Sequence, residues 1–153
     1  MNASGRVGRI FGVALWAMGL AGCGSPDSPE TRVRAVIASA EQAAEARDLS
    51  AVMALVSPDY ADAEGRQAAE LSRYLRGYFI ANQSIHLLTR IDSLEFPARD
   101  VAEVALTVAM VGREAEAESP WDLAADVHSL RLTLMEKDGD WRVTHADRQP
   151  GGR

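Results

Sequence analysis

The hydrophobic positions of the chain follow helical spacing first and strand alternation afterwards. Between residues 30 and 46, apolar side chains recur every three or four positions, which predicts an amphipathic helix. Asp48 is expected to begin a second, shorter helix that ends at Ser57-Pro58, and a third helix is expected at about residues 66–82. The N-terminal half of the domain is therefore predicted to be largely helical.

From Ser84 onward, apolar and polar positions alternate, as they do in half-buried strands. Strands are expected at residues 85–96, 101–111, 123–136 and 141–148. Asp138-Gly139, between the last two, is a preferred pair for a tight hairpin turn. Helices followed by an antiparallel sheet predict an α+β domain, with the helices packed on one face of the sheet.

The first 23 residues have the features of a secretion signal. A positively charged start precedes an apolar segment, residues 10–20, that is too short to span a bilayer as a helix. This segment ends in Leu20-Ala21-Gly22-Cys23, which resembles the bacterial lipobox. The resemblance implies cleavage between Gly22 and Cys23. It also implies acylation of Cys23, which would hold the protein at the membrane. An ordinary signal peptide with a stray cysteine is the alternative.

Lipidation would divide the chain into four parts. They are a signal peptide at residues 1–22, a lipidated tether at 23–29, the domain at 30–148 and a disordered tail at 149–153. The residue after Cys23 is Gly24 and not the aspartate that retains some lipoproteins at the inner membrane. By analogy with enteric sorting, we therefore expect the protein on the periplasmic side of the outer membrane in preference to the inner membrane. Cys23 is the only cysteine, which excludes a disulfide or a thiolate metal site in the domain.

The charge of the chain narrows the classes of partner. The first 22 residues contain two of the 16 basic residues and none of the 22 acidic ones, so the chain from Cys23 onward has a net charge of −8. It contains no run of basic residues. Neither nucleic acid nor electrostatic docking on an anionic lipid surface is therefore expected.

Two segments of the chain resemble the nuclear transport factor 2-like superfamily. One runs from residue 46 to 60 and ends in Pro58-Asp59-Tyr60, and the other is the hairpin at residues 138–143. The resemblance extends over residues 30–148 and implies a cone, in which a strongly curved sheet wraps around the helices and leaves a pocket at its open end. It implies no particular activity, because the superfamily includes isomerases, dehydratases, cyclases and domains without catalysis.

The predicted hairpin indicates which side chains share the concave face of the sheet. With Asp138-Gly139 as a two-residue turn, Leu134 pairs with Val143, Leu132 with His145 and Leu130 with Asp147. The apolar members of these pairs require this face to be the buried one. A β-bulge in either strand would move the side chains beyond it to the opposite face of the sheet.

In that register, four polar side chains lie towards the open end of the concave face: Asp126, His128, His145 and Asp147. These residue types suit an acid/base pair or a metal site, but no metal-ligand spacing supports a metal and no cofactor is expected. Simple solvation or hydrogen bonding of these groups is the alternative. Tyr60 is a further candidate, with its phenol either in the pocket or in the core.

Several aromatic residues and one glycine have predicted structural roles. Tyr74, Tyr78 and Phe79 share one stripe of the third helix and are expected in the core. Gly77 in the same helix suggests a close approach of another backbone. Trp121 is expected either as a lid over the pocket, as a partner contact, or as a cover for the sheet edge.

We expect a lipid-anchored periplasmic domain without catalytic activity, which binds another envelope protein or a small apolar ligand. The alternative is a small isomerase, dehydratase or cyclase that uses His and Asp at the mouth of the cone. A homodimer through the convex sheet face fits the resemblance, although Arg131, Thr133, Arg142 and Thr144 make that face polar.

Overall fold

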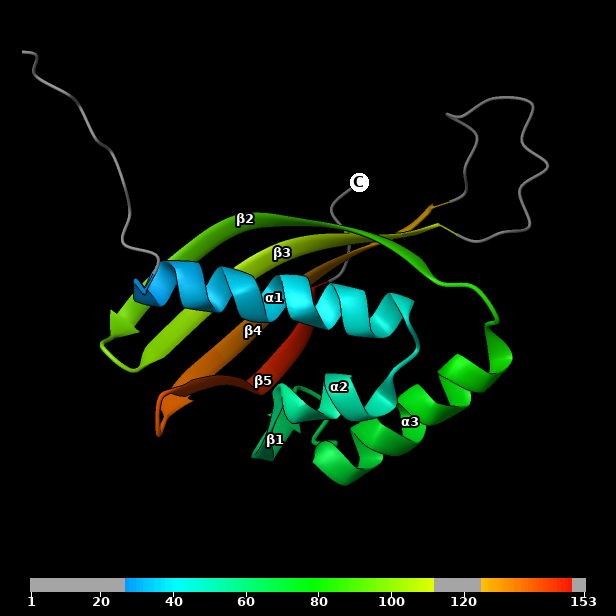
Figure 1. The fold of residues 1–153 in the computed structure, drawn as a ribbon, viewed down its shortest axis with the longest axis horizontal. Coiled ribbons are helices and arrows are strands. Elements are labelled where there is room, and N and C mark those ends of the chain that lie inside the picture. Colours follow the sequence, from blue (N-terminus) through cyan, green and yellow to red (C-terminus); the bar gives the residue numbers. More distant parts are fainter. Residues whose placement is uncertain (1–26, 112–124, 150–153) are drawn as a thin grey trace, which may run out of the picture.

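A computed structural model describes residues 27–111 and 125–149. Cys23, Gly22 and Trp121 lie outside these ranges. The elements are α1 (Pro29–Glu45), α2 (Leu49–Ala54), β1 (Val56–Asp62), α3 (Ala68–Ala81), β2 (His86–Ala98), β3 (Val101–Val111), β4 (Ala125–Lys137) and β5 (Asp140–Gln149). Helices precede the four long strands, which confirms the α+β class (Figure 1).

Hydrogen bonds from side chains and backbone fix where the helices begin. The hydroxyl of Ser28 accepts from the N–H of Thr31 over 3.2 Å, and Pro29 occupies the first turn of α1. Asp48 accepts from the N–H of Ala51 over 3.0 Å at the start of α2. The start of α2 at Asp48 is the one that the sequence predicted. In the described ranges, no helix is both long and apolar enough to cross a membrane.

The five strands form one curved sheet in the order β1-β5-β4-β3-β2. Strands β2 to β5 pair antiparallel, but β1 pairs parallel with β5, so the sheet is mixed and not wholly antiparallel as predicted. Since α3 and three strands separate β1 from β5 in the chain, no hairpin forces those two to run antiparallel. Register shifts in β2 help to curve the sheet, and β2 and β3 arch along α1 (Figure 1).

The hydrophobic core lies between α1 and the concave face of the sheet. Its buried residues come from one face of α1 and from alternating positions on three strands: Val33, Ile37, Ala102, Val104, Leu106, Leu134 and Trp141. The strand members of β3 lie at every second position, in agreement with the predicted alternation of apolar and polar residues. The space between α1 and the sheet is therefore filled by side chains.

Helix α3 differs from its prediction in two respects. Phe79 is buried, but Tyr74 is 57% exposed, so its expected place in the core is wrong. Helix α3 contacts α2 and β1, and its apolar residue Ile80 is exposed as well. Gly77 is wrong as a marker of close packing, because a Cβ added there would meet no atom within 4 Å.

Candidate functional site

A register shift in β5 decides which predicted residues reach the concave face. Leu134 pairs with Val143 as expected, but the next pair is Thr133 with His145, so Thr144 is the extra residue of a bulge. The hydroxyl of Thr144 donates to the carbonyl oxygen of Thr133 over 3.2 Å. One added residue moves every later side chain of the strand to the other face.

The bulge separates the four polar residues that were expected to lie together. His145 and Asp147 pair with Thr133 and Arg131, on the convex face, so their predicted position on the concave face is wrong. The convex position follows from pairing with odd-numbered residues of β4, because even-numbered ones such as Leu134 face the core. The sequence offers no signal for this bulge, because Thr144 is an ordinary strand residue.

His128 lies on the concave face, as predicted, and its partner there is an arginine that sequence reasoning missed. The bulge turns Arg148 onto this face, where it pairs with Leu130 in the ladder. A terminal nitrogen of Arg148 lies 2.7 Å from Nδ1 of His128. Since a guanidinium only donates, Nδ1 must accept, and the ring proton is then carried by Nε2.

The rest of the concave end is largely apolar. Met110 and Val108 of β3 pair with Asp126 and His128 of β4, so all four backbone positions belong to the concave face. The hydroxyl of Tyr78 donates to Sδ of Met110 over 3.7 Å, which links α3 to this end of the sheet. The side chain of Asp126 lies outside the described part of the structure.

Tyr60 is 4% exposed in β1, which favours its core alternative. Burial of the ring and, to a smaller extent, the neighbouring carboxylate of Asp62 raise the pKa of its phenol above the usual value. The hydroxyl therefore stays protonated near neutral pH. Among the side chains that the structure describes, no group of three or more metal-ligating residues occurs.

Asp62 is a buried carboxylate that was not among the candidates predicted from the sequence. It accepts hydrogen bonds from the backbone of Glu64 and Arg66 over 3.0 and 2.8 Å, and from Nε of Arg66 over 2.6 Å. Burial tends to raise the pKa of Asp62, but the hydrogen bonds and charge of Arg66 outweigh it and hold the pKa below its usual value. This pair ties the end of β1 to the loop that precedes α3.

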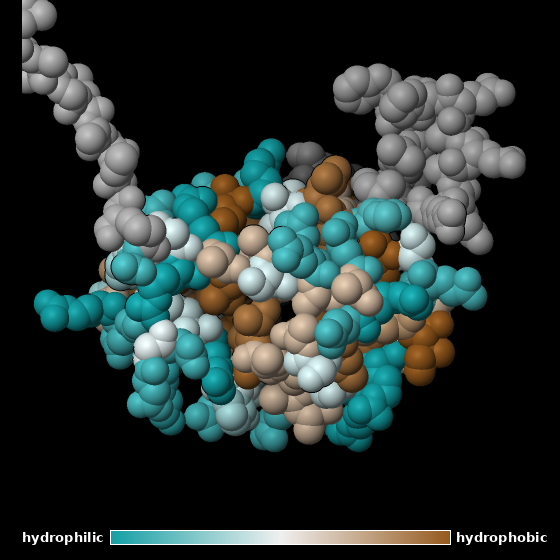
Figure 2. All heavy atoms as spheres, viewed as in Figure 1, coloured by the Kyte–Doolittle hydropathy of each residue, from teal (hydrophilic) through white to brown (hydrophobic). Residues whose placement is uncertain are grey.

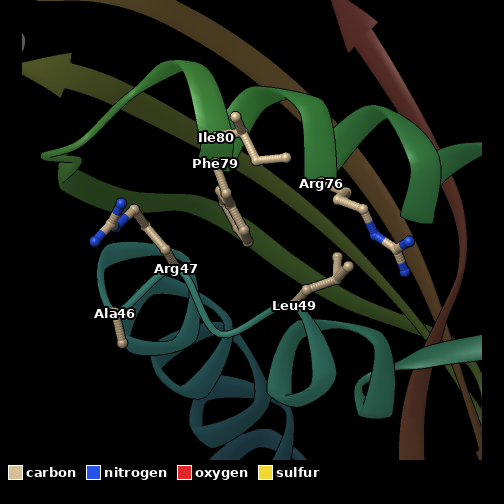
Figure 3. A pocket seen from close by; sticks show the side chains of 6 residues that line it. All are labelled: Ala46, Arg47, Leu49, Arg76, Phe79 and Ile80. Carbon is tan, nitrogen blue, oxygen red and sulfur yellow. The ribbon is translucent and has the colours of Figure 1, made fainter.

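A separate hollow of about 290 Å³ lies between the end of α1, the start of α2 and α3 (Figure 3). Its lining consists of four apolar residues and two arginines: Ala46, Leu49, Phe79, Ile80, Arg47 and Arg76. The ring of Phe79 points into the space between the helices, with the two guanidinium groups on opposite sides of it (Figure 3). None of the residues predicted for the site lines this hollow.

No protein-family model matches the sequence, and no curated protein matches it. Solved structures do resemble the fold. A nuclear transport factor 2-like protein of unknown function from Shewanella oneidensis is 14% identical, with a TM-score of 0.63, covering 80% of this chain and 100% of its own. One from Pseudomonas putida is 15% identical, with a TM-score of 0.63, covering 81% and 87%.

A third similar structure is a putative scytalone dehydratase from Novosphingobium aromaticivorans. It is 14% identical, with a TM-score of 0.65, and the match covers 80% of this chain and 84% of that one. At these identities the likeness concerns the fold alone. The arrangement of helices within a curved sheet is therefore the nuclear transport factor 2-like cone.

Proposed function

We propose that this chain is a lipoprotein, anchored through Cys23 on the periplasmic side of the outer membrane, whose domain binds without catalysing a reaction. The occupant of its concave face is a small apolar ligand or a segment of another envelope protein. One observation carries the proposal of binding without catalysis. The bulge at Thr144 separates His145 and Asp147 from His128, which leaves His128 paired with Arg148.

General acid–base catalysis requires a base within hydrogen-bond reach of its orienting partner and of the substrate. A carboxylate beside an imidazole raises its basicity, whereas a guanidinium that donates to Nδ1 competes with a proton at that nitrogen. Nδ1 of His128 is therefore already engaged in a hydrogen bond with Arg148. An apolar face that ends in a basic group suits recognition of a ligand better than proton transfer.

The anchor places this domain close to the membrane. Helix α1 begins at Pro29, so the tether from Cys23 contains only a few residues, mostly small ones and prolines. Fully extended, it reaches about 20 Å. A domain on so short a tether is suited to partners in the membrane or immediately above it.

The second candidate is a small isomerase, dehydratase or cyclase that acts on an apolar ligand. The features in its favour are the fold shared with a putative scytalone dehydratase and the position of His128 on the concave face. His128→Gln distinguishes the candidates when conversion of a co-purified molecule is followed. An enzyme that uses His128 loses turnover, whereas a binding domain shows none in the wild type.

A homodimer through the convex face is a further part of the proposal. Leu88, Ala109 and Val127 lie side by side on β2, β3 and β4, and Leu88 and Val127 are mostly exposed. Glu95, Glu103 and Arg131 line a polar hollow elsewhere on this face. Sedimentation equilibrium of the full chain in detergent measures the oligomeric state, and a concentration-independent monomer would remove the dimer from the proposal.

The anchor is tested by expressing the full chain in a Gram-negative host supplied with an alkyne-tagged fatty acid. Wild type is expected to incorporate the tag and to fractionate with the outer membrane, and Cys23→Ser to incorporate none. An untagged wild-type chain would refute the lipoprotein assignment.

Binding on the concave face is tested with a matched pair of substitutions. His128→Trp fills the concave end, and His145→Trp adds the same bulk on the convex face. The co-purified molecule or partner is expected to be lost from the first variant and retained by the second. Equal retention by both would place binding elsewhere.

A further inference from the structure

The hollow between α1, α2 and α3 is amphipathic. Phe79 is buried and Leu49 is half-buried, so the hollow has an apolar floor, but Ile80 at its edge is 76% exposed. Hydrophobic surface also appears over the C-terminal half of α3, beside hydrophilic side chains (Figure 2). An aliphatic side chain left in water beside such a hollow favours an apolar occupant, because covering it removes apolar area from water.

The two arginines of the hollow have no carboxylate partner in the described ranges. Six other arginines there form ion pairs with Asp or Glu: Arg32, Arg34, Arg66, Arg73, Arg90 and Arg142. Arg73, one turn before Arg76 on α3, pairs with Glu70 at 3.8 Å. In a chain with an excess of acidic residues, Arg47 and Arg76 thus place two guanidinium groups without a carboxylate partner beside apolar surface, within the described ranges.

The backbone at Arg47 adds a second, independent observation. Arg47 has a φ of +55°, and the N–H groups of Arg47 and Asp48 bond to the carbonyls of Ala44 and Ala43, as in a Schellman motif. Glycine is the usual residue at this position, because a side chain in the left-handed region is strained. Arg47 therefore has a side chain where the fold favours none, and that side chain lines the hollow.

We propose that this hollow binds a free anionic amphiphile, such as an alkyl carboxylate or alkyl phosphate. Arg47 and Arg76, on opposite sides of the Phe79 ring, each present a guanidinium group that can donate paired hydrogen bonds to the anionic group of a ligand in the hollow. Phe79, Leu49 and Ile80 contact its alkyl chain. The volume of about 290 Å³ is at the small end for a ligand pocket, so it suits a short chain or the first part of a longer one.

A free molecule is a better occupant than a lipid within the bilayer. The hollow lies at the end of α1 opposite to the tether, and a helix of 17 residues is about 25 Å long. The net negative charge of the chain also disfavours close approach to an anionic bilayer surface. This site is separate from the concave face. Only the choice of a free molecule over a bilayer lipid rests on the proposed anchor at Cys23.

The test uses the full chain in nanodiscs of phosphatidylcholine, titrated calorimetrically with hexyl phosphate and hexanoate, with empty discs subtracted. Saturable binding of both anions is expected, and the neutral hexyl glucoside is expected not to bind. Arg76→Met is expected to weaken binding about tenfold, whereas Arg73→Met, on the same helix, leaves it unchanged. Equal binding of the neutral compound, or no saturable binding of the anions, would overturn the proposal.

The variant Arg47→Gly distinguishes the loss of a binding side chain from the loss of folded structure. It is expected to weaken binding about tenfold while raising the melting temperature, because glycine relieves the strain at φ +55°. Unchanged binding in this variant would overturn the role of Arg47.

The same titration in nanodiscs of phosphatidylglycerol distinguishes a free amphiphile from a bilayer lipid. If these discs abolish hexyl phosphate binding in wild type, the occupant is a bilayer lipid and the assignment to a free amphiphile fails.

Discussion

Arg148 donates a hydrogen bond to Nδ1 of His128 over 2.7 Å, although the two residues lie on different strands and 20 positions apart in the sequence. They meet because a single extra residue, Thr144, turns Arg148 onto the concave face of the sheet. The same shift turns His145 away. One bulge thus removes His145 and Asp147 from the predicted cluster and brings Arg148 beside His128.

This pair fixes the tautomer of His128. Because Nδ1 accepts from Arg148, the proton of the neutral ring is expected on Nε2, and ¹⁵N chemical shifts of the imidazole measure this directly. Arg148→Met removes the donor and is expected to give a mixture of tautomers at His128, with no change at His145. A wild-type ring protonated mainly on Nδ1 would contradict the observed pairing.

Asp62 is expected to stabilise the domain in a pH-dependent way. Its pKa in the folded state lies below the unfolded value near 3.9, so its contribution is complete above that value and is lost as the pH falls through the folded pKa. Asp62→Asn is expected to lower the free energy of unfolding at pH 7 by about 1–2 kcal/mol, a value reduced for the exposure of Arg66.

The difference between wild type and Asp62→Asn is expected to shrink below about pH 4 in urea denaturation. Asp140→Asn is the control, because Asp140 is an exposed carboxylate whose nearest cationic nitrogen, on Arg142, is 3.6 Å away. It is expected to change stability little at either pH. A constant difference between wild type and Asp62→Asn at all pH values would show that the charge of Asp62 contributes nothing.

Substitutions at two glycines distinguish the effect of backbone conformation on stability from the effect of packing. At both Gly77 and Gly139 an added Cβ would meet no atom within 4 Å, but Gly77 is helical and Gly139 has a φ of +88°. Gly77→Ala is therefore expected to raise the free energy of unfolding by about 1 kcal/mol. Gly139→Ala is expected to lower it by about 1–2 kcal/mol. Urea denaturation of both variants measures the effects, and changes of the same sign would refute this account.

Trp141 is buried against Phe96, with ring centroids 6.0 Å apart, and its indole N–H has no hydrogen-bond partner in the described structure. Trp141→Ala is expected to cost about 3–5 kcal/mol through the cavity that it leaves. Trp141→Phe keeps an aromatic ring and removes an unpaired N–H, so it is expected to cost only about 1–2 kcal/mol. Equal losses in thermal unfolding would indicate that the N–H has a partner.

Much of this fold could be predicted because local rules determine it. Strand β3 has the predicted bounds, and the turn at Asp138-Gly139 has positive φ at both residues, as the hairpin signal required. Helix α1 begins one residue before its predicted start, because Ser28 and Pro29 are strong initiation signals. The alternation of apolar residues also identified the buried face of β3 and of β4.

The candidate site was less predictable because it depends on long-range geometry. No local pattern marks Thr144 as a bulge, so the faces of His145, Asp147 and Arg148 could not be assigned from the sequence. The parallel pairing of β1 with β5 joins segments that are far apart in the chain. The hollow around Phe79 likewise forms only when three helices meet.

The central claim, an acylated domain that binds without catalysing a reaction, is tested most directly by native mass spectrometry of the full chain extracted from membranes in mild detergent. We predict a chain that begins at Cys23 and carries the mass of its acyl groups, together with one noncovalent molecule or partner that a denaturing spectrum removes. An unacylated chain with nothing bound would contradict both the anchor and the binding function.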